Sequence, residues 1–275
     1  MQDPQRTQAQ GCAFRKRLDK WLLPTLPVIA LVAAAVWSQG HGPAPGKPQA
    51  SPHTGAAAPA HLADFAGQAP SPDARVLANW VAATDDNKDR AFVIVDKKDA
   101  RAYVFTPDDR LADSAPVLVG QAHGDEVLPG SGDKSPAEMT PEEKTTPAGR
   151  FVAEPGENAS KEDVIWVDYD DAISMHRVRP TVASEHRLER LASPAADDNR
   201  ISFGCINLPV TFYEDVARPM VQKYGAVIYV LPEVKTLQQV FGAYDVTDPT
   251  QVAAARQTLA DAARHAVQAR APAQG

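Results

Sequence analysis

Residues 91–105 read AFVIVDKKDARAYVF, and this stretch decides the fold class. The runs 92–95 and 101–105 are rich in β-branched and aromatic residues, with polar residues 96–99 between them, so the pattern predicts a β-hairpin. Further runs of this kind occur at residues 115–119, 149–153, 164–167, 173–176 and 226–231. We therefore expect a mainly β fold with a few helices (α+β), built largely from antiparallel strands.

Two segments near these runs have helical patterns. Residues 73–84 place apolar side chains at helical spacing, and residues 209–224 begin with a proline, which a first turn tolerates. Near the C-terminus, Asp248 is a suitable N-cap for an alanine-rich helix over about 249–269. We assign residues 73–234 to one folded domain and residues 235–275 to a C-terminal tail that contains this last helix.

The first 72 residues have a different composition. Residues 1–20 carry five basic and two acidic side chains, and residues 21–37 (WLLPTLPVIALVAAAVW) carry no charge. This order predicts a cytoplasmic basic tail followed by an inner-membrane anchor or a cleaved signal peptide, and we favour the anchor. Residues 38–72 hold nine Ala, seven Pro and five Gly, a composition typical of a linker. The domain is therefore expected in the periplasm, anchored through residues 21–37, or secreted if that segment is cleaved.

Composition also excludes several classes of protein. The formal net charge is −7, which argues against nucleic acid as a partner. Two cysteines, Cys12 and Cys205, are too few for a disulfide framework or a Cys-rich zinc site. No set of His, Asp and Glu has zinc-ligand spacing, so we expect no metal and no cofactor.

The residues that carry chemistry are concentrated in Ser202-Phe203-Gly204-Cys205-Ile206-Asn207. A cysteine nucleophile reacts as the thiolate, so it needs a base, and a neighbouring glycine lets backbone and substrate approach closely. Successive N–H groups in such a turn can hold an oxyanion. His176 ends a predicted strand and is the first choice as base, while His186 is the second. On the residues alone, the alternative of a small cysteine buried in the core stays open.

Three separated pieces of this sequence resemble the YkuD-type L,D-transpeptidase catalytic domain. They are Thr146-Pro147-Ala148-Gly149-Arg150-Phe151, then His176, then the Ser-x-Gly-Cys motif at 202–205, and they occur in the family's order. The hairpin at 91–105 is similar to the family's opening hairpin. The resemblance covers residues 91–232. It implies a YkuD-like β-sandwich or mixed-sheet catalytic domain.

The resemblance also implies roles for individual residues. Cys205 is the expected nucleophile and His176 the general base, oriented by the carbonyl oxygen of Arg177. The N–H groups of residues 203–205, including that of Gly204, would line the oxyanion hole. The residues expected to contact substrate or brace the turn are Ser202, Asn207, Arg177 and Phe203. The substrate would be a peptidoglycan stem peptide, cross-linked to a neighbouring stem through an acyl-enzyme without metal or cofactor.

Three departures from the family's pattern affect this interpretation. Phe203 replaces a histidine before Gly-Cys, Arg177 replaces a small residue after His176, and the interval from His176 to Cys205 is longer than is usual. The inserted stretch 177–200 is rich in arginine, so one interpretation is a cationic lid that binds stem-peptide carboxylates. The other is a solvated loop in which acidic residues balance the arginines.

Two further functions stay open on the sequence. An L,D-carboxypeptidase or endopeptidase would resolve the same acyl-enzyme with water. A non-catalytic peptidoglycan-binding module would keep the fold without the reaction. Which of the two L-to-D bonds of a stem peptide is cut is open as well.

Overall fold

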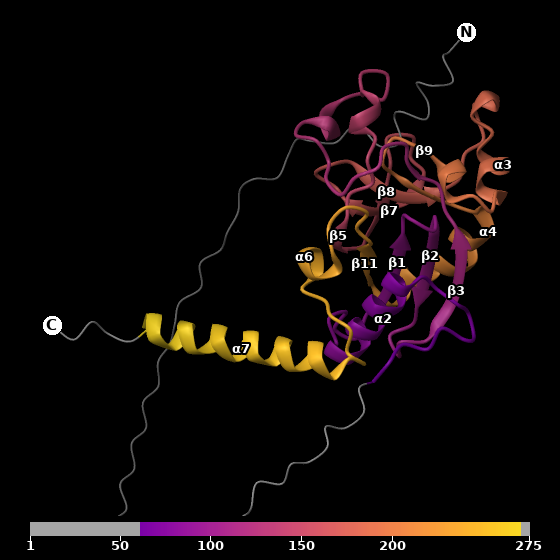
Figure 1. The fold of residues 1–275 in the computed structure, drawn as a ribbon. Coiled ribbons are helices and arrows are strands. Elements are labelled where there is room, and N and C mark those ends of the chain that lie inside the picture. The colour runs from indigo at the N-terminus through magenta and orange to yellow at the C-terminus, as the bar shows by residue number, and fades with distance from the viewer. Residues whose placement is uncertain (1–60, 271–275) are drawn as a thin grey trace, which may run out of the picture. The chain divides into compact units, whose positions relative to one another are not determined.

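Two β-sheets with accompanying helices make up the part of the chain that this computed structural model describes, residues 61–270 (Figure 1). The predictions for residues 1–20, 21–37 and 38–60 lie outside the described residues. Within residues 61–270, none of the helices has the length and apolar character that crossing a membrane requires.

The larger sheet has five strands in the order β3–β2–β1–β11–β5. Its members are β1 (Ala91–Asp96), β2 (Arg101–Phe105), β3 (Leu111–Pro116), β5 (Gly149–Val152) and β11 (Ala226–Val230). β1 and β2 form the predicted hairpin. β11, the last strand of the chain, pairs in parallel with β1 and antiparallel with β5, so it completes the middle of the sheet.

The smaller sheet has four strands in the order β10–β8–β7–β6. Its members are β6 (Glu154–Glu157), β7 (Asp163–Asp168), β8 (Ile173–Arg177) and β10 (Ile206–Leu208). The β8–β10 pair is parallel and the other two pairs are antiparallel. Two short strands, β4 (Val119–Gly120) and β9 (Arg200–Ser202), form a separate parallel pair.

Helices follow or connect these strands. The α-helices are α2 (Pro72–Thr84), α3 (Arg187–Ala192), α4 (Val210–Phe212), α5 (Arg218–Tyr224), α6 (Leu237–Phe241) and α7 (Pro249–Arg270). A π-helical turn, η5 (Tyr213–Ala217), joins α4 to α5, so the predicted helix over 209–224 is present but wider in its middle. The inserted stretch 177–200 contains α3 between two 3₁₀ turns, η3 (Ala183–Glu185) and η4 (Ala196–Asn199).

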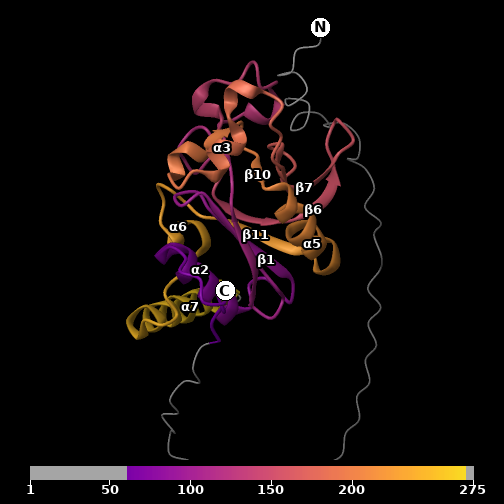
Figure 2. The ribbon, with the colours of Figure 1, turned by 90° about the vertical axis from the view of Figure 1, so that its right-hand side faces the viewer.

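The larger sheet is buried on both faces. Alternate side chains of β1 enter different clusters: Val93 and Val95 pack with residues of the smaller sheet, whereas Phe92 and Ile94 pack with α2. α5 adds Val221 to the first cluster. Figure 2 shows this helix close to the strands of the larger sheet. This arrangement explains why β1 reads as a continuous apolar run rather than an alternating one.

The expected linker over 38–72 ends earlier than predicted. Phe65 is buried, and its ring lies 5.7 Å from that of Tyr103 and 5.1 Å from that of Phe105. Asp64 forms a β-bridge with Arg110. A single aromatic residue within an alanine- and proline-rich stretch was enough to bind this segment to the domain.

The expected tail over 235–275 also differs at its start. Leu237 and Phe241 of α6 pack against the cluster beneath α2, so this part of the tail belongs to the domain. α7 agrees with the predicted last helix. At its start Thr250 N–H donates to Asp248 Oδ1 at 2.8 Å, as expected for an N-cap.

The predicted fold class is confirmed: mixed sheets are accompanied by a few helices. The expectation of largely antiparallel pairing is confirmed as well: five of the eight strand pairs within residues 61–270 are antiparallel, while β1–β11, β8–β10 and β4–β9 are parallel. Strands β6, β9 and β10 were not predicted, since each is only three or four residues long.

Candidate active site

Cys205 lies in the turn between β9 and β10, directly after a glycine. Gly204 has a φ of +121°, and a Cβ there would lie 2.8 Å from Ile173 Cδ1 and 2.8 Å from Thr145 O. Ser202 Oγ donates to Cys205 O at 2.6 Å and accepts from Gly204 N–H at 3.1 Å. Glycine is therefore required, and Ser202 braces the turn. The Gly204 N–H, which we expected in the oxyanion hole, is instead used inside the turn.

Parallel pairing of β8 with β10 brings the predicted base beside this turn. Asn207 is the register partner of His176. Residues two apart on a strand share a face, so Ser174 and His176 lie on the face that carries Cys205 and Asn207. The two strands thus place four polar side chains next to one another at the edge of the smaller sheet.

The sulfur of Cys205 is buried, with 3% of the residue exposed. Sγ lies 3.6 Å from Ser174 Oγ and 3.7 Å from Ala172 O. The thiolate is the reactive form of a cysteine nucleophile, so the chemistry considered below is that of the reduced side chain. The sequence analysis did not identify Ser174 as a site residue. The only indication in the sequence is that this polar residue lies two positions before His176 and so on the same face of the strand.

His176 has a defined tautomer. Its Nδ1 lies 2.8 Å from Arg177 O, and because a carbonyl oxygen only accepts, Nδ1 carries the proton and Nε2 the lone pair. Nε2 lies 3.4 Å from Asn207 Nδ2. Burial is the chief cause that lowers the pKa of His176 to about 4; the hydrogen bond to Arg177 opposes it, and the charges of Arg187 and Arg177 add to it. The imidazole is therefore neutral at ordinary pH, as a base must be.

Thr146 connects the turn to the rest of the domain. Its hydroxyl donates to Gly204 O at 2.7 Å and accepts from Gly120 N–H at 2.8 Å. Its carbonyl oxygen accepts from Lys97 Nζ at 2.9 Å, and that buried ammonium also pairs with Asp125 at 3.3 Å. The Thr-Pro-x-Gly-x-Phe segment thus supports the turn through its first residue, a role that the sequence did not reveal.

Every arginine of the inserted stretch has a partner within the protein. The pairs are Arg177 with Asp163 and Glu214, Arg179 with Glu162, Arg187 with Glu185 and Asn207, Arg190 with the carbonyl oxygens of Glu185 and Asp198, and Arg200 with Glu233. Because these groups already satisfy the guanidinium ions, the geometry does not favour a cationic lid that binds substrate carboxylates. The alternative of a solvated loop also fails in part, since Arg187 and Arg200 are buried.

The expected substrate contact of Arg177 differs from its observed position. Its side chain lies between Asp163 and Glu214 and over the ring of Tyr213, 4.4 Å from the ring centre. Its carbonyl oxygen is the part that reaches His176. The side chain of Arg177 therefore anchors the end of β8, and its charge is neutralised by Asp163 and Glu214. Its backbone carbonyl oxygen holds the His176 ring in place.

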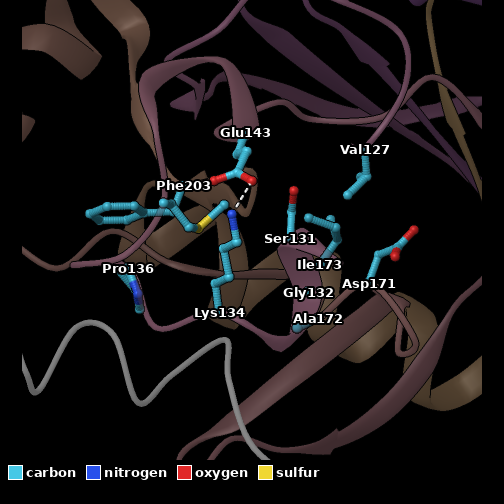
Figure 3. Close-up of a pocket in the computed structure, with 11 residues that line it drawn as sticks. Val127, Ser131, Gly132, Lys134, Pro136, Glu143, Asp171, Ala172, Ile173 and Phe203 are labelled. Carbon is cyan, nitrogen blue, oxygen red and sulfur yellow. Dashed lines mark hydrogen bonds and ion pairs between the residues drawn. The ribbon is translucent and has the colours of Figure 1, made fainter. Parts of the chain in front are cut away.

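A pocket adjoins the turn on the side of Phe203 (Figure 3). The loop before β5 contributes both apolar and polar side chains to its lining, and residues 171–173, at and just before the start of β8, complete it together with Phe203. Lys134 and Glu143 form an ion pair at its edge. Ala172 O is also a neighbour of the Cys205 sulfur. The cavity volume is about 20 Å³, little more than one water molecule needs, so in this conformation it admits only a small group.

The structure brings His176, Ser202, Gly204, Cys205 and Asn207 into one cluster, with Phe203 at its edge. His186, the second choice as base, has 66% of its side chain exposed and pairs with Glu189 instead. Within residues 61–270, no group of three or more His, Cys, Asp or Glu side chains is arranged to hold a metal ion.

Solved structures similar to this chain include three of L,D-transpeptidases. The NMR structure of the catalytic domain of the Enterococcus faecium enzyme is 15% identical, covers 52% of this chain and 98% of its own, and has a TM-score of 0.31. A cysteine-to-serine mutant of the Enterococcus faecium enzyme (15% identity, TM-score 0.29) and the Mycobacterium smegmatis enzyme (17%, 0.29) also cover 52% of this chain. They match over 50% and 58% of their own lengths.

No protein-family model and no curated protein matches the chain. The three structures agree with the family that the sequence motifs resemble. The fold class itself is defined by the sheets and helices described above.

Proposed function

We propose that this chain is a peptidoglycan L,D-transpeptidase that works through a Cys205 acyl-enzyme with His176 as general base. The observation that supports it is the β8–β10 pairing, which sets the Cys205 sulfur beside Ser174 and the His176 ring beside Asn207. The motif resemblance supplies the substrate class, a stem peptide with an L-to-D peptide bond. The neutral imidazole and the braced turn are what a cysteine nucleophile needs.

The chemistry divides into two transfers of the same acyl group. In the reduced protein, Nε2 of His176 takes the proton of the Cys205 thiol, and the thiolate attacks the carbonyl carbon at the L-residue. The carbon–nitrogen bond to the D-residue breaks, the thioester remains, and the proton passes from His176 to the leaving amine. An amine of a second stem then attacks the thioester and gives up a proton, so that the cross-link forms and the thiol is restored.

Two features of the site support binding of a peptide. The pocket beside Phe203 shares Ala172 with the surroundings of the Cys205 sulfur, and Lys134 and Glu143 form an ion pair among its lining residues. The ring of Phe203 is held by the ammonium of Lys144, 4.8 Å from its centre. An apolar portion of the donor would fit against this ring while the scissile carbonyl meets the sulfur.

The proposed location is the periplasm, with residues 21–37 as an anchor in the inner membrane. It is supported by the basic residues 1–20 before an uncharged apolar run and by the composition of the linker after it. There the domain would meet peptidoglycan, its proposed partner.

The test uses the full-length protein in detergent, reduced and mixed with disaccharide-tetrapeptide. Intact mass and product analysis compare the wild type with Cys205→Ala and with Cys12→Ala, which removes the other cysteine of the chain. We expect an acyl adduct and cross-linked dimers from the wild type and from Cys12→Ala, and neither from Cys205→Ala. An adduct followed only by shortened peptides would make the protein a hydrolase. Binding without any adduct would make it a non-catalytic peptidoglycan-binding module.

A further inference from the structure

The inserted stretch 177–200 sends one buried side chain into the site. Arg187 begins α3 and is 5% exposed. Its Nη1 donates to Asn207 Oδ1 at 2.6 Å, and its Nε donates to Glu185 Oε2 at 2.6 Å. Because a guanidinium carries donors only, the Asn207 atom that faces Arg187 must be the oxygen. The NH₂ group of that amide must then point the other way.

The other side of the Asn207 amide faces the histidine. Its Nδ2 lies 3.4 Å from His176 Nε2 and 3.3 Å from Cys205 O. An NH₂ group can donate to Nε2 only while Nε2 carries a lone pair. The opposite ring nitrogen, Nδ1, already donates to Arg177 O. Both sides of the ring therefore select the same tautomer.

We infer that Arg187 is a positioning residue of this site: it fixes the orientation of the Asn207 amide, and the amide keeps the lone pair of His176 on Nε2, where the thiol proton must go. The catalytic consequence rests on the proposed function, whereas the hydrogen-bond chain does not. The longer interval between His176 and Cys205 thereby has a use, because it supplies the cation that orients the Asn207 amide.

The chain of hydrogen bonds also opposes an imidazolium. A proton on Nε2 would set two donors, the ring N–H and the Asn207 NH₂, against each other. The charges that act on the ring are those of Arg187 on α3 and Arg177 on β8, and Arg187 is paired in turn with Glu185; the turn before β10 adds the Cys205 thiol to the same cluster. Two of these are cations, which agrees with the lowered pKa of His176.

The inference is tested by the ring ¹⁵N signals of His176, followed by NMR in full-length Cys205→Ser protein. This background removes the titrating thiol, and His176→Gln identifies the signal. Three proteins are compared from about pH 3 to pH 8, a range that brackets a normal histidine pKa: the background alone, Arg187→Met and Arg190→Met. Arg190 is the matched control, because it lies on the same helix and donates to the carbonyl oxygens of Glu185 and Asp198.

We expect a single Nδ1–H tautomer in the background and in Arg190→Met. Arg187→Met should give a mixture of tautomers and raise the pKa of His176 by about one unit, since a nearby charge and a donor are both lost. Unchanged tautomer and pKa in Arg187→Met would overturn the inference. If that variant fails to fold, Glu185→Gln with Arg187→Met removes the unpaired carboxylate and gives the same comparison.

A second variant tests the amide itself. Asn207→Asp keeps a partner for Arg187 but turns an acceptor toward Nε2, so the pKa of His176 should rise and the Nε2–H tautomer should appear. An Asn207→Asp protein with an unchanged ring signal would contradict the inference. A single tautomer in a protein that forms no adduct with stem peptides would sink the proposed function alone. If the wild type forms adducts but the tautomer and pKa of His176 are unchanged in Arg187→Met, the proposed function stands and the positioning role of Arg187 is refuted.

Discussion

The hydroxyl of Thr146 is the contact on which the geometry of the Cys205 turn depends, and Thr146→Val tests this directly. Valine keeps the shape of the side chain but neither donates nor accepts. The change leaves Gly204 C=O without its 2.7 Å donor and Gly120 N–H without its 2.8 Å acceptor, both in a buried region. Each unsatisfied buried group costs about 1–3 kcal/mol, so the free energy of unfolding should fall by about 2–5 kcal/mol.

The neighbouring threonine gives a matched control. Thr145 is also buried, but its hydroxyl makes one hydrogen bond, to Glu142 O at 3.1 Å. Thr145→Val should therefore cost only about 1 kcal/mol. Urea unfolding of the reduced proteins measures both changes, and the rate of acyl-adduct formation should fall in Thr146→Val alone, because Gly204 precedes the nucleophile. Equal costs for the two variants would refute the view that Thr146 holds the turn.

Two further predictions concern the same turn and its base. Gly204→Ala should lower the free energy of unfolding by about 2–5 kcal/mol and abolish the adduct, because the backbone strain of a positive φ adds to the 2.8 Å contacts with Ile173 and Thr145. Gly67→Ala is the control: φ is +80° there and nothing lies within 4 Å, so only the backbone strain should lower its stability. His176, with a pKa of about 4 folded and 6.5 unfolded, binds more protons in the unfolded state between those values. Its contribution is therefore complete above pH 6.5 and lost as pH falls toward 4, about 3 kcal/mol that urea unfolding should detect in the wild type and not in His176→Gln. A wild type and a His176→Gln variant with the same pH slope would show that the histidine is not buried as described.

Most of the strands could be predicted because their signal is local. The hairpin of β1 and β2, and strands β7 and β11, each contain at least four apolar or β-branched side chains, whereas β5 and β8 contain two each beside the motif residues. Which strand pairs with which could not be predicted, because the register of β8 with β10 depends on burial shared across the two sheets. The predicted end of the linker was wrong for the same reason, because the burial of Phe65 depends on its contacts with Tyr103 and Phe105, which lie far away in the sequence.

In the candidate site, the motif residues could be predicted from the sequence, but the residues that contact and orient them could not. His176, Cys205 and Gly204 are marked by residue type and by resemblance, and the structure brings them together. Ser174 and Arg187 carry no such mark, because a serine in a strand and an arginine in a polar loop are ordinary. Their importance comes only from the sulfur 3.6 Å from one and the amide oxygen 2.6 Å from the other.

The parallel pairing of β1 with β11 has a consequence for synthesis of the chain. Ala91 near the start of the domain is the partner of Ala226 near its end, so the middle of the larger sheet stays incomplete until almost the whole domain has left the ribosome. Such distant pairing slows folding, since the loop between the partners must close first. A nascent chain halted before residue 226 would hold β1 with one edge unpaired. The nucleophile and base, at residues 205 and 176, are therefore synthesised before the middle strand of the sheet behind them is available.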